Sequence, residues 1–309
     1  MKKVFIDGKA GTTGLRIEER LAGRDDICII TLPDELRKDA AAKKKVMNEA
    51  DIVFLCLPDD AARESVSLIE SESTVVIDAS TAHRTDPAWA YGFPELAPEF
   101  ESAIKSSKRI AVPGCHASGF IALVYPLVKA GVLSPDTPLT VHSLTGYSGG
   151  GKKMIADYEG QGRDKLLDAP RQYGITQSHK HLPEMTAVCR LSVTPIFCPI
   201  VSDFYSGMEV TVPLFKSQLC NGDADTVREI YKNLYTGPVV NYCEEADESG
   251  FLSASKLSGK DSMQIEVHGS DERILLVARY DNLGKGASGA AVECLNVVLG
   301  CDKTKALEV

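Results

Sequence analysis

The residue best placed to act as a nucleophile is Cys115, in the run Val112-Pro-Gly-Cys-His-Ala-Ser-Gly119. It follows an apolar segment and a Pro-Gly turn, and it directly precedes an apolar segment of helical length, residues 117–130. A thiol at a helix N-terminus lies near backbone amides and the positive end of the helix dipole, which favour the thiolate. Most of the nine cysteines lie in apolar runs instead. The pattern therefore predicts a reactive thiol, with a buried structural cysteine as the alternative.

A nucleophilic thiol needs an acid/base partner, and one segment gathers suitable groups. Of the six histidines, only His179 and His181 lie together with an ammonium and a carboxylate, in Ser178-His-Lys-His-Leu-Pro-Glu184. In an extended segment the two imidazoles would point to the same side, with Lys180 opposite. Further metal ligands are missing nearby in the sequence, so we predict acid/base chemistry and no metal site. The spacing leaves open which histidine acts, and two surface histidines in a polar loop are the alternative.

The glycines near the N-terminus have the arrangement of a dinucleotide-binding turn. They follow the first apolar run and open a predicted helix: Gly8, Gly11 and Gly14, with Thr12 and Thr13 between the last two. Such a turn lets the backbone approach a pyrophosphate at a helix N-terminus. The spacing differs from the commoner Gly-x-Gly-x-x-Gly, so a glycine-rich turn in a nucleotide-free α/β fold is the alternative.

The end of the second predicted strand bears on the choice of nicotinamide cofactor. An acidic residue normally ends this strand when the cofactor has no 2′-phosphate. Here the strand runs into Thr31-Leu-Pro, and the cations Arg37 and Lys38 follow a few residues later. We therefore predict NADP rather than NAD. Leu57 and Pro58, at the end of the third predicted strand, are expected to face the same cofactor.

Two further glycine-rich segments could contact a substrate or a cofactor. Residues 146–153, Gly-Tyr-Ser-Gly-Gly-Gly-Lys-Lys, lack P-loop spacing but combine flexible backbone with cations, which suits an acyl or phosphate group. Residues 281–289, Asp-Asn-Leu-Gly-Lys-Gly-Ala-Ser-Gly, precede the last predicted helix, and their backbone could lie against a cofactor. Each segment alone is also compatible with an ordinary turn.

The composition indicates an ordinary globular protein. The chain has 309 residues, 44% hydrophobic and 25% charged, which is enough for two domains. A net charge of -9 argues against a protein that tracks nucleic-acid phosphates. No run approaches the roughly 18 to 20 apolar residues of a membrane span, and the apolar run near the N-terminus is too short for a signal peptide. The odd number of cysteines, without a Cys-x-x-Cys pair, favours reduced thiols in the cytoplasm.

The first part of the chain predicts a doubly wound α/β domain. Short β-branched runs alternate with amphipathic stretches, which is typical of a parallel sheet covered on both faces. The expected strands are 4–6, 27–31, 51–57, 74–77 and 109–112, and the expected helices are 13–22, a polar stretch reaching residue 48, and 60–70.

Beyond residue 115 the pattern changes to longer alternating strands, which indicates an α+β domain with a mixed sheet. The expected strands are 139–144, 188–193, 208–213, 264–268 and 273–280, after a helix at 117–130 that Pro126 should kink. A last helix at 288–299 should return to the first domain. We therefore expect a Rossmann-type NADP-binding domain of residues 1–115 with 288–309, and a catalytic and dimerisation domain of residues 116–287.

Together these segments resemble one enzyme family over nearly the whole chain, the N-acetyl-γ-glutamyl-phosphate reductases of arginine biosynthesis, in their shorter variant. The His-x-His-x-Pro-Glu and Tyr-Gly-x-Pro-Glu-Leu runs favour this family over the related aspartate-semialdehyde dehydrogenases, which share its two-domain plan. The resembling segments are 8–14, Asp78-Ala-Ser-Thr-Ala-His-Arg84, Tyr91-Gly-Phe-Pro-Glu-Leu96, 112–119, 146–152, 179–184 and 282–289.

The resemblance implies that the Cys115 thiolate displaces phosphate from an acyl phosphate and forms a thioester. NADPH then reduces the thioester to N-acetylglutamate semialdehyde, while His179 or His181 manages the proton. Amides at the start of the following helix could stabilise the oxyanion. Arg84, with Lys152 as second choice, is the candidate for holding phosphate or carboxylate.

The resemblance also implies further binding residues and an assembly. We expect Gly146, Ser148 and Glu184 to contact the substrate. We expect the cofactor to contact Ser80, Asn282 and Gly286, in addition to the glycine turn and the residues named with it. The enzyme should be a cytoplasmic homo-oligomer, a dimer or tetramer, without nucleic-acid or membrane partners.

Two alternatives remain beside this reading. The first is a reductase of another acyl phosphate, such as aspartyl or aminoadipyl phosphate. The second is a nonenzymatic protein that senses NADP, which would need only the glycine turn. The presence of Cys115 together with the histidine pair counts against such a sensor.

Overall fold

The computed structural model describes residues 1–37 and 39–309, so Lys38, one of the two cations behind the NADP prediction, lies outside the described residues. The chain divides into two compact units. The first unit comprises Met1–Pro94, Pro98–Pro113 and Ala287–Leu307, and the second comprises Glu95–Ala97, Gly114–Gly286 and Glu308–Val309.

The first unit contains a parallel sheet of six strands in the order β2-β1-β3-β4-β6-β5. Its two central strands, β3 and β4, are buried along their whole length, because helices cover both faces. The strands are β1 (Lys2–Asp7), β2 (Ile27–Ile30), β3 (Ile52–Leu55), β4 (Val75–Asp78), β5 (Ala90–Tyr91) and β6 (Arg109–Ala111).

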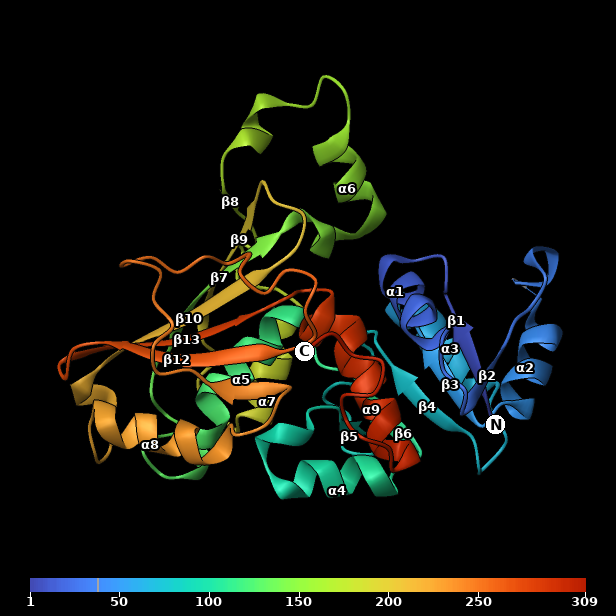
Figure 1. Ribbon diagram of the computed structural model, residues 1–309, viewed down its shortest axis with the longest axis horizontal. Helices are drawn as coiled ribbons and strands as arrows, with labels where there is room; N and C mark the ends of the chain where they lie inside the picture. The colour runs from blue at the N-terminus through green and yellow to red at the C-terminus, as the bar shows by residue number, and fades with distance from the viewer. Residues whose placement is uncertain (38) are drawn as a thin grey trace. The chain divides into compact units, whose positions relative to one another are not determined.

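Two hydrophobic clusters cover the two faces of this sheet. Phe54 belongs to a cluster with side chains of α1 (Thr12–Leu21) and α9 (Gly289–Leu299), whereas its neighbour Val53 belongs to a cluster with side chains of α2 (Ala40–Glu49) and α3 (Asp59–Ser67). This alternation is the doubly wound arrangement that the apolar runs predicted. Figure 1 shows α9, drawn in red, beside the strands of this unit, together with α4 (Pro98–Ser106).

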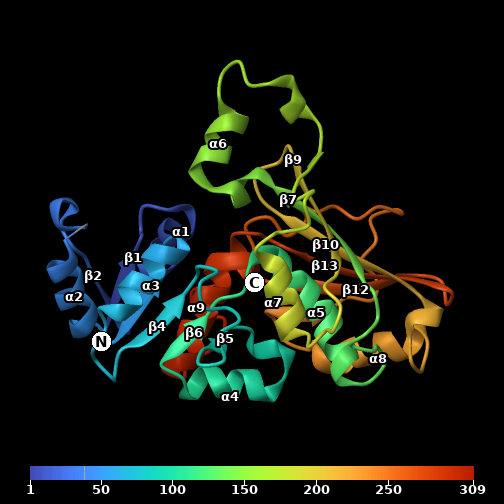
Figure 2. The same cartoon turned by 180° about the vertical axis from the view of Figure 1, so that it is seen from behind.

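The second unit contains a mixed sheet of seven strands in the order β11-β12-β13-β10-β7-β9-β8. Its central strand pairs are antiparallel, whereas β11 with β12 and β7 with β9 are parallel. The strands are β7 (Thr140–Gly146), β8 (Arg171–Gln172), β9 (Ile196–Ser202), β10 (Met208–Phe215), β11 (Val240–Tyr242), β12 (Met263–Gly269) and β13 (Arg273–Tyr280). Figure 2 shows α5 (Cys115–Lys129) and α7 (His181–Val188) side by side against this sheet, and the unit also contains α6 (Gly151–Glu159) and α8 (Ala224–Leu234).

Three local predictions for the second unit are wrong. The alternating run 188–193 is not a strand: Val188 ends α7, and Arg190 follows in a turn with a φ of 56°. The strand β9 was missed, because Pro199 lies inside it and lacks the N–H that a sheet ladder normally uses. The segment 179–181 is not extended, since Lys180 already has helical dihedrals at the start of α7.

Helix α5 continues through Pro126, the residue expected to kink it. Proline has no N–H, so the carbonyl four residues earlier, that of Ala122, loses its helical donor. The Tyr235 hydroxyl donates to this carbonyl at 2.6 Å and replaces the missing bond. Although α5 is apolar on all sides, neither it nor any other helix of the described residues is long and apolar enough to cross a membrane.

Candidate active site

The glycine turn of the first unit packs too closely for side chains. Gly8 has a φ of +84°, and a Cβ atom there would lie 2.3 Å from the carbonyl oxygen of Cys56. A Cβ at Gly14 would lie 2.7 Å from the carbonyl oxygen of Gly8. Gly11 is the N-cap of α1, and Thr12 and Thr13 form its first turn, where backbone amides have no acceptor within the helix. The turn therefore presents backbone donors at a helix N-terminus, as a pyrophosphate requires.

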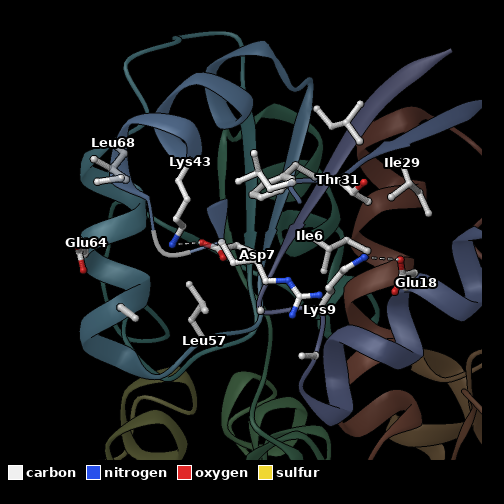
Figure 3. A pocket seen from close by; sticks show the side chains of 18 residues that line it. Ile6, Asp7, Lys9, Glu18, Ile29, Thr31, Lys43, Leu57, Glu64 and Leu68 are labelled. Atoms are coloured by element: carbon white, nitrogen blue, oxygen red, sulfur yellow. Dashed lines mark hydrogen bonds and ion pairs between the residues drawn. The ribbon is translucent and has the colours of Figure 1, made fainter. Parts of the chain in front are cut away.

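A cavity of about 420 Å³ lies beside this turn and is lined by Gly8, Thr31, Arg37 and Leu57, among others (Figure 3). Two lysines that the sequence did not single out also line it. Lys43 lies 2.7 Å from Asp7, and Lys9 lies 3.5 Å from Glu18. Three cations and three carboxylates, those of Asp7, Glu18 and Glu64, thus line the cavity, and the neighbouring strand β2 is followed by Thr31-Leu-Pro rather than by an acid. These residues fit a dinucleotide with a 2′-phosphate better than one with a bare ribose.

The other predicted first-unit residues have defined partners. Pro58 is the N-cap of α3. The Ser80 hydroxyl donates to the buried Asp78 carboxylate at 2.7 Å, which also contacts Nδ1 of His83 at 2.7 Å. Arg84 donates to two backbone carbonyls beyond the ends of β4 and β6, those of Ala79 at 3.0 Å and Val112 at 2.9 Å. The structure thus places Arg84 in the first unit, where it ties strand ends together.

Cys115 is the first residue of α5, and three contacts fix the backbone around it. The N–H of the preceding Gly114 donates to the Glu184 carboxylate at 2.8 Å. The Tyr280 hydroxyl donates to the Cys115 carbonyl. A Cβ atom on Gly286 would lie 3.1 Å from that of Cys115, so the segment packs tightly against the start of α5. The helix thus begins at the thiol itself, two residues before the predicted start at residue 117.

The two predicted histidines lie together with a third imidazole. The ring centroids of His179 and His181 are 4.8 Å apart. The centroid of the His116 ring lies 6.0 Å from that of His179 and 5.5 Å from that of His181. Tyr173 and Phe197 pack edge-on against the ring of His179. Because His116 directly follows Cys115, this cluster belongs to the start of α5.

Burial keeps two of these imidazoles neutral. Desolvation, with a smaller effect of His179, lowers the pKa of His116 to about 3. Desolvation, with a smaller effect of the Lys180 ammonium, also lowers the pKa of His179. Nδ1 of His179 accepts a hydrogen bond from the backbone N–H of His181 at 3.2 Å, so the neutral ring holds its proton on Nε2.

His116 itself is held by two hydroxyl groups. Its Nδ1 lies 2.6 Å from the Ser143 hydroxyl, and its Nε2 lies 2.6 Å from the Tyr173 hydroxyl. Desolvation, followed by the charge of Cys115, raises the pKa of Tyr173, so its hydroxyl stays protonated at neutral pH. No sequence motif indicated Ser143 or Tyr173, which reach the site from β7 and from the segment after β8.

The remaining predicted residues lie in the second unit, where Asn282, Ser148 and Gly146 contact other protein groups and Lys152 is exposed. Asn282 donates to the Ser148 hydroxyl at 2.9 Å and accepts from the N–H of Gly207 at 2.9 Å. Gly146 packs against backbone, since a Cβ there would lie 2.6 Å from a carbonyl oxygen. Lys152 is exposed on α6. Asn282 and Gly286, predicted for the cofactor, therefore share a unit with Cys115 and not with the glycine turn.

No cluster of three or more possible metal ligands occurs in the described part of the chain.

Both parts of the chain match family models. Residues 3–104 match the NAD binding domain of semialdehyde dehydrogenases, and residues 115–282 match their dimerisation domain. The chain is 47% identical over 305 residues to N-acetyl-γ-glutamyl-phosphate reductase from a Chelativorans species, covering 96% of this chain and 98% of that one. The reductase from Brucella ovis is 45% identical over 306 residues, covering 96% and 99%. The chain belongs to the N-acetyl-γ-glutamyl-phosphate reductase family. This confirms the family that the motifs indicated.

Solved structures share the fold of this family at low identity. Aspartate semialdehyde dehydrogenase II from Vibrio cholerae matches with a TM-score of 0.73 and 16% identity, over 97% of this chain and 98% of that one. Aspartate semialdehyde dehydrogenase from Candida albicans, solved with NADP, matches with a TM-score of 0.69 and 14% identity, over 97% and 99%. The predicted fold class, a Rossmann-type parallel sheet with a mixed-sheet α+β unit, is confirmed.

Proposed function

We propose that this chain reduces N-acetyl-γ-glutamyl phosphate to N-acetylglutamate semialdehyde and phosphate, with NADPH as the reductant. The observation that carries the proposal is Cys115 at the first position of α5, next to an imidazole cluster, in a chain 47% identical to such a reductase. A thiol in this position is favoured as thiolate by the helix dipole and by the amides at the helix start, which have no acceptor within the helix.

The first step is an acyl transfer to sulfur. The Cys115 thiolate attacks the carbonyl carbon, a C–S bond forms, and the bond to phosphate breaks with its electron pair leaving on the phosphate oxygen. First-turn amides of α5 stabilise the negative charge that develops on the carbonyl oxygen. NADPH, when bound, supplies the hydride that reduces the thioester carbon. Cys115 then takes back the C–S electron pair as the aldehyde is released.

The imidazole pair, His179 and His181, manages the proton. It accepts the proton of the Cys115 thiol and returns a proton when the thiohemiacetal collapses. Burial supports this role, because it keeps His179 neutral and therefore able to accept a proton at pH 7. Arg84 and Lys152 remain our candidates for contacting phosphate or carboxylate, with Gly146, Ser148 and Glu184 as further substrate contacts.

The cofactor is assigned to the domain formed by residues 1–115 with 288–309. The glycine turn would hold its pyrophosphate, and Arg37 and Lys43, which both line the adjacent cavity, would face a 2′-phosphate. Leu57, Pro58 and Ser80, at the carboxyl ends of the parallel strands, would contact the rest of it, with Asn282 and Gly286 contributed by the catalytic domain, residues 116–287.

We further propose that the protein is a cytoplasmic homo-oligomer, a dimer or tetramer. Helix α5 covers one face of the mixed sheet, where Tyr280 and Val210 lie against it. Leu275 and Phe215 point to the other face and are 41% and 62% exposed. These two exposed apolar side chains, in a region that matches a dimerisation domain, support pairing with a second copy. None of the nine cysteines forms a disulfide, which agrees with a reducing compartment.

The test is the reaction run in reverse. N-acetylglutamate semialdehyde, phosphate and NADP should give NADPH, and Cys115→Ser should abolish the signal. Aspartate and aminoadipate semialdehydes, each with NADP and NAD, test the alternative substrates and the cofactor preference. Faster turnover of either semialdehyde would replace the proposed substrate, and undiminished activity of Cys115→Ser would overturn the mechanism. Binding of NADP without turnover of any semialdehyde would support the sensor.

A further inference from the structure

The hydroxyl of Tyr280 lies against the first turn of α5. In this turn the N–H of Gly119 and the carbonyl of Cys115, four residues earlier, are the donor and the acceptor of one helical hydrogen bond. The N–H of Gly119 donates to the Tyr280 oxygen at 3.0 Å, and the Tyr280 hydroxyl in turn donates to the Cys115 carbonyl. The side chain of Tyr280 thus bridges the two backbone groups of the turn that carries the thiol.

Burial and the absence of a side chain at position 119 allow Tyr280 to make these two hydrogen bonds. Its side chain is fully buried at the end of β13. Position 119 is glycine, and a Cβ atom there would lie 2.8 Å from the Tyr280 oxygen and 2.7 Å from a methyl carbon of Val210. Burial, with a smaller effect of the Cys115 charge, raises the pKa of Tyr280 well above its ordinary value. The hydroxyl therefore remains a proton donor throughout the working pH range.

Fixing the Cys115 carbonyl also fixes an amide at the reacting end of the helix. The peptide group between Cys115 and His116 is planar, so the direction of its carbonyl determines the direction of the His116 N–H. That N–H belongs to the first turn of α5, where amides have no acceptor within the helix and can stabilise a thiolate or an oxyanion. A hydrogen bond to the carbonyl also polarises the N–H of the same peptide group.

We propose that Tyr280 is a positioning residue of the reaction, which orients the peptide group after Cys115 and so favours the thiolate and the oxyanion. The proposal rests on the proposed function, because it takes Cys115 as the nucleophile. Tyr280 is argued to act through the backbone, without touching the substrate.

Two other tyrosines provide matched controls in the same helix. Tyr235 donates to the carbonyl of Ala122, and Tyr231 donates to the carbonyl of Leu123, both about two turns further along α5. Each is buried and each contacts an α5 carbonyl, as Tyr280 does. Loss of the Tyr235 hydroxyl should therefore reproduce the loss of a buried hydrogen bond without changing the turn at Cys115.

The experiment compares Tyr280→Phe with Tyr235→Phe in the full-length enzyme. Alkylation of Cys115 by iodoacetamide is followed against pH by mass spectrometry of its peptide, together with kcat and KM. For Tyr280→Phe we expect the alkylation profile to move to higher pH, alkylation at pH 7 to slow by roughly tenfold, and kcat to fall at least about tenfold with little change in KM. Tyr235→Phe should lower Tm and leave the profile in place.

An alkylation profile and a kcat of Tyr280→Phe equal to those of Tyr235→Phe would overturn the proposal. If Tyr280→Phe does not fold, Gly119→Ala, whose Cβ displaces the hydroxyl, must give the same displacement of the profile. Failure of the proposed function is distinguishable, since Cys115→Ser would then remain active while the alkylation comparison still reports the effect of Tyr280.

Discussion

The carboxylate of Glu184 accepts a hydrogen bond, 2.8 Å long, from the backbone N–H of Gly114, the residue before Cys115. Glu184 is 1% exposed and lies on α7, whose first residue is His181. One short helix therefore presents an imidazole of the candidate site and also holds the turn that carries the thiol. The spacing within the His-x-His-x-Pro-Glu run gives α7 both roles.

Removing this carboxylate should slow turnover more than it weakens binding. In Glu184→Ala the buried N–H of Gly114 loses its acceptor, which costs about 1–3 kcal/mol. We expect kcat to fall roughly 10- to 100-fold through misplacement of Cys115, with a lower Tm and a small change in substrate KM. Glu184→Gln keeps an acceptor oxygen and should retain most of the activity. Equal losses in steady-state kinetics of both variants would instead indicate that the reaction depends on the negative charge of Glu184 and not on its hydrogen bond to Gly114.

Replacing either imidazole of the pair should remove proton transfer. His179→Asn and His181→Asn are each expected to lower kcat by roughly 10²- to 10⁴-fold. The kcat of the double variant should be only slightly below that of the less active single variant, because the two rings act as a unit. His268→Asn, on β12 and paired with Glu266 at 3.0 Å, is the control and should keep its activity. Near-normal kcat in both single variants would exclude the pair from the reaction.

The acid limb of the pH–rate profile should respond to Lys180. Desolvation and the Lys180 ammonium lower the pKa of His179, so the ring becomes protonated, and activity is lost, only below the ordinary pH range for histidine. Lys180→Gln removes the positive charge, raises the pKa of His179 and should move the acid limb of kcat/KM to higher pH. High salt should reduce this difference, because Lys180 is exposed. An acid limb that stays in place would assign it to another group.

The Tyr235 hydroxyl should matter for stability only while position 126 is proline. Tyr235→Phe leaves the Ala122 carbonyl buried without a donor and should lower the free energy of unfolding by about 1–3 kcal/mol. In a Pro126→Ala background the new N–H can donate to that carbonyl, so the same substitution should cost less. Urea unfolding of the four proteins measures the coupling. Additive losses would contradict this account of how α5 passes through Pro126.

Much of the fold and the centre of the site could be predicted from local sequence. Buried parallel strands such as β3 are continuous apolar runs, and the cysteine and the histidine pair are recognisable from their own neighbours. The strand β9 was missed because Pro199 contradicts a strand pattern, although its carbonyl still accepts from the N–H of Tyr173 at 3.0 Å. Run 188–193 alternates for another reason: Cys189 and Leu191 are both buried, in the turn that ends α7.

The groups that hold the site could not be predicted, because they come from distant parts of the chain. Ser143 and Tyr280 lie in β7 and β13, and Tyr173 directly follows β8. They contact His116 and Cys115 only through the fold of the second unit, which no local pattern specifies. Lys43 likewise reaches the cofactor cavity from a polar helix that reads as solvent-exposed. Sequence patterns identify reactive residues more readily than the residues that position them.

Mass spectrometry of the enzyme mixed with N-acetyl-γ-glutamyl phosphate in the absence of NADPH shows directly whether Cys115 forms a thioester. We expect an acyl adduct on the Cys115 peptide, which is absent in Cys115→Ser and disappears when NADPH is added. An adduct on another residue, or normal turnover by Cys115→Ser without any adduct, would contradict this expectation.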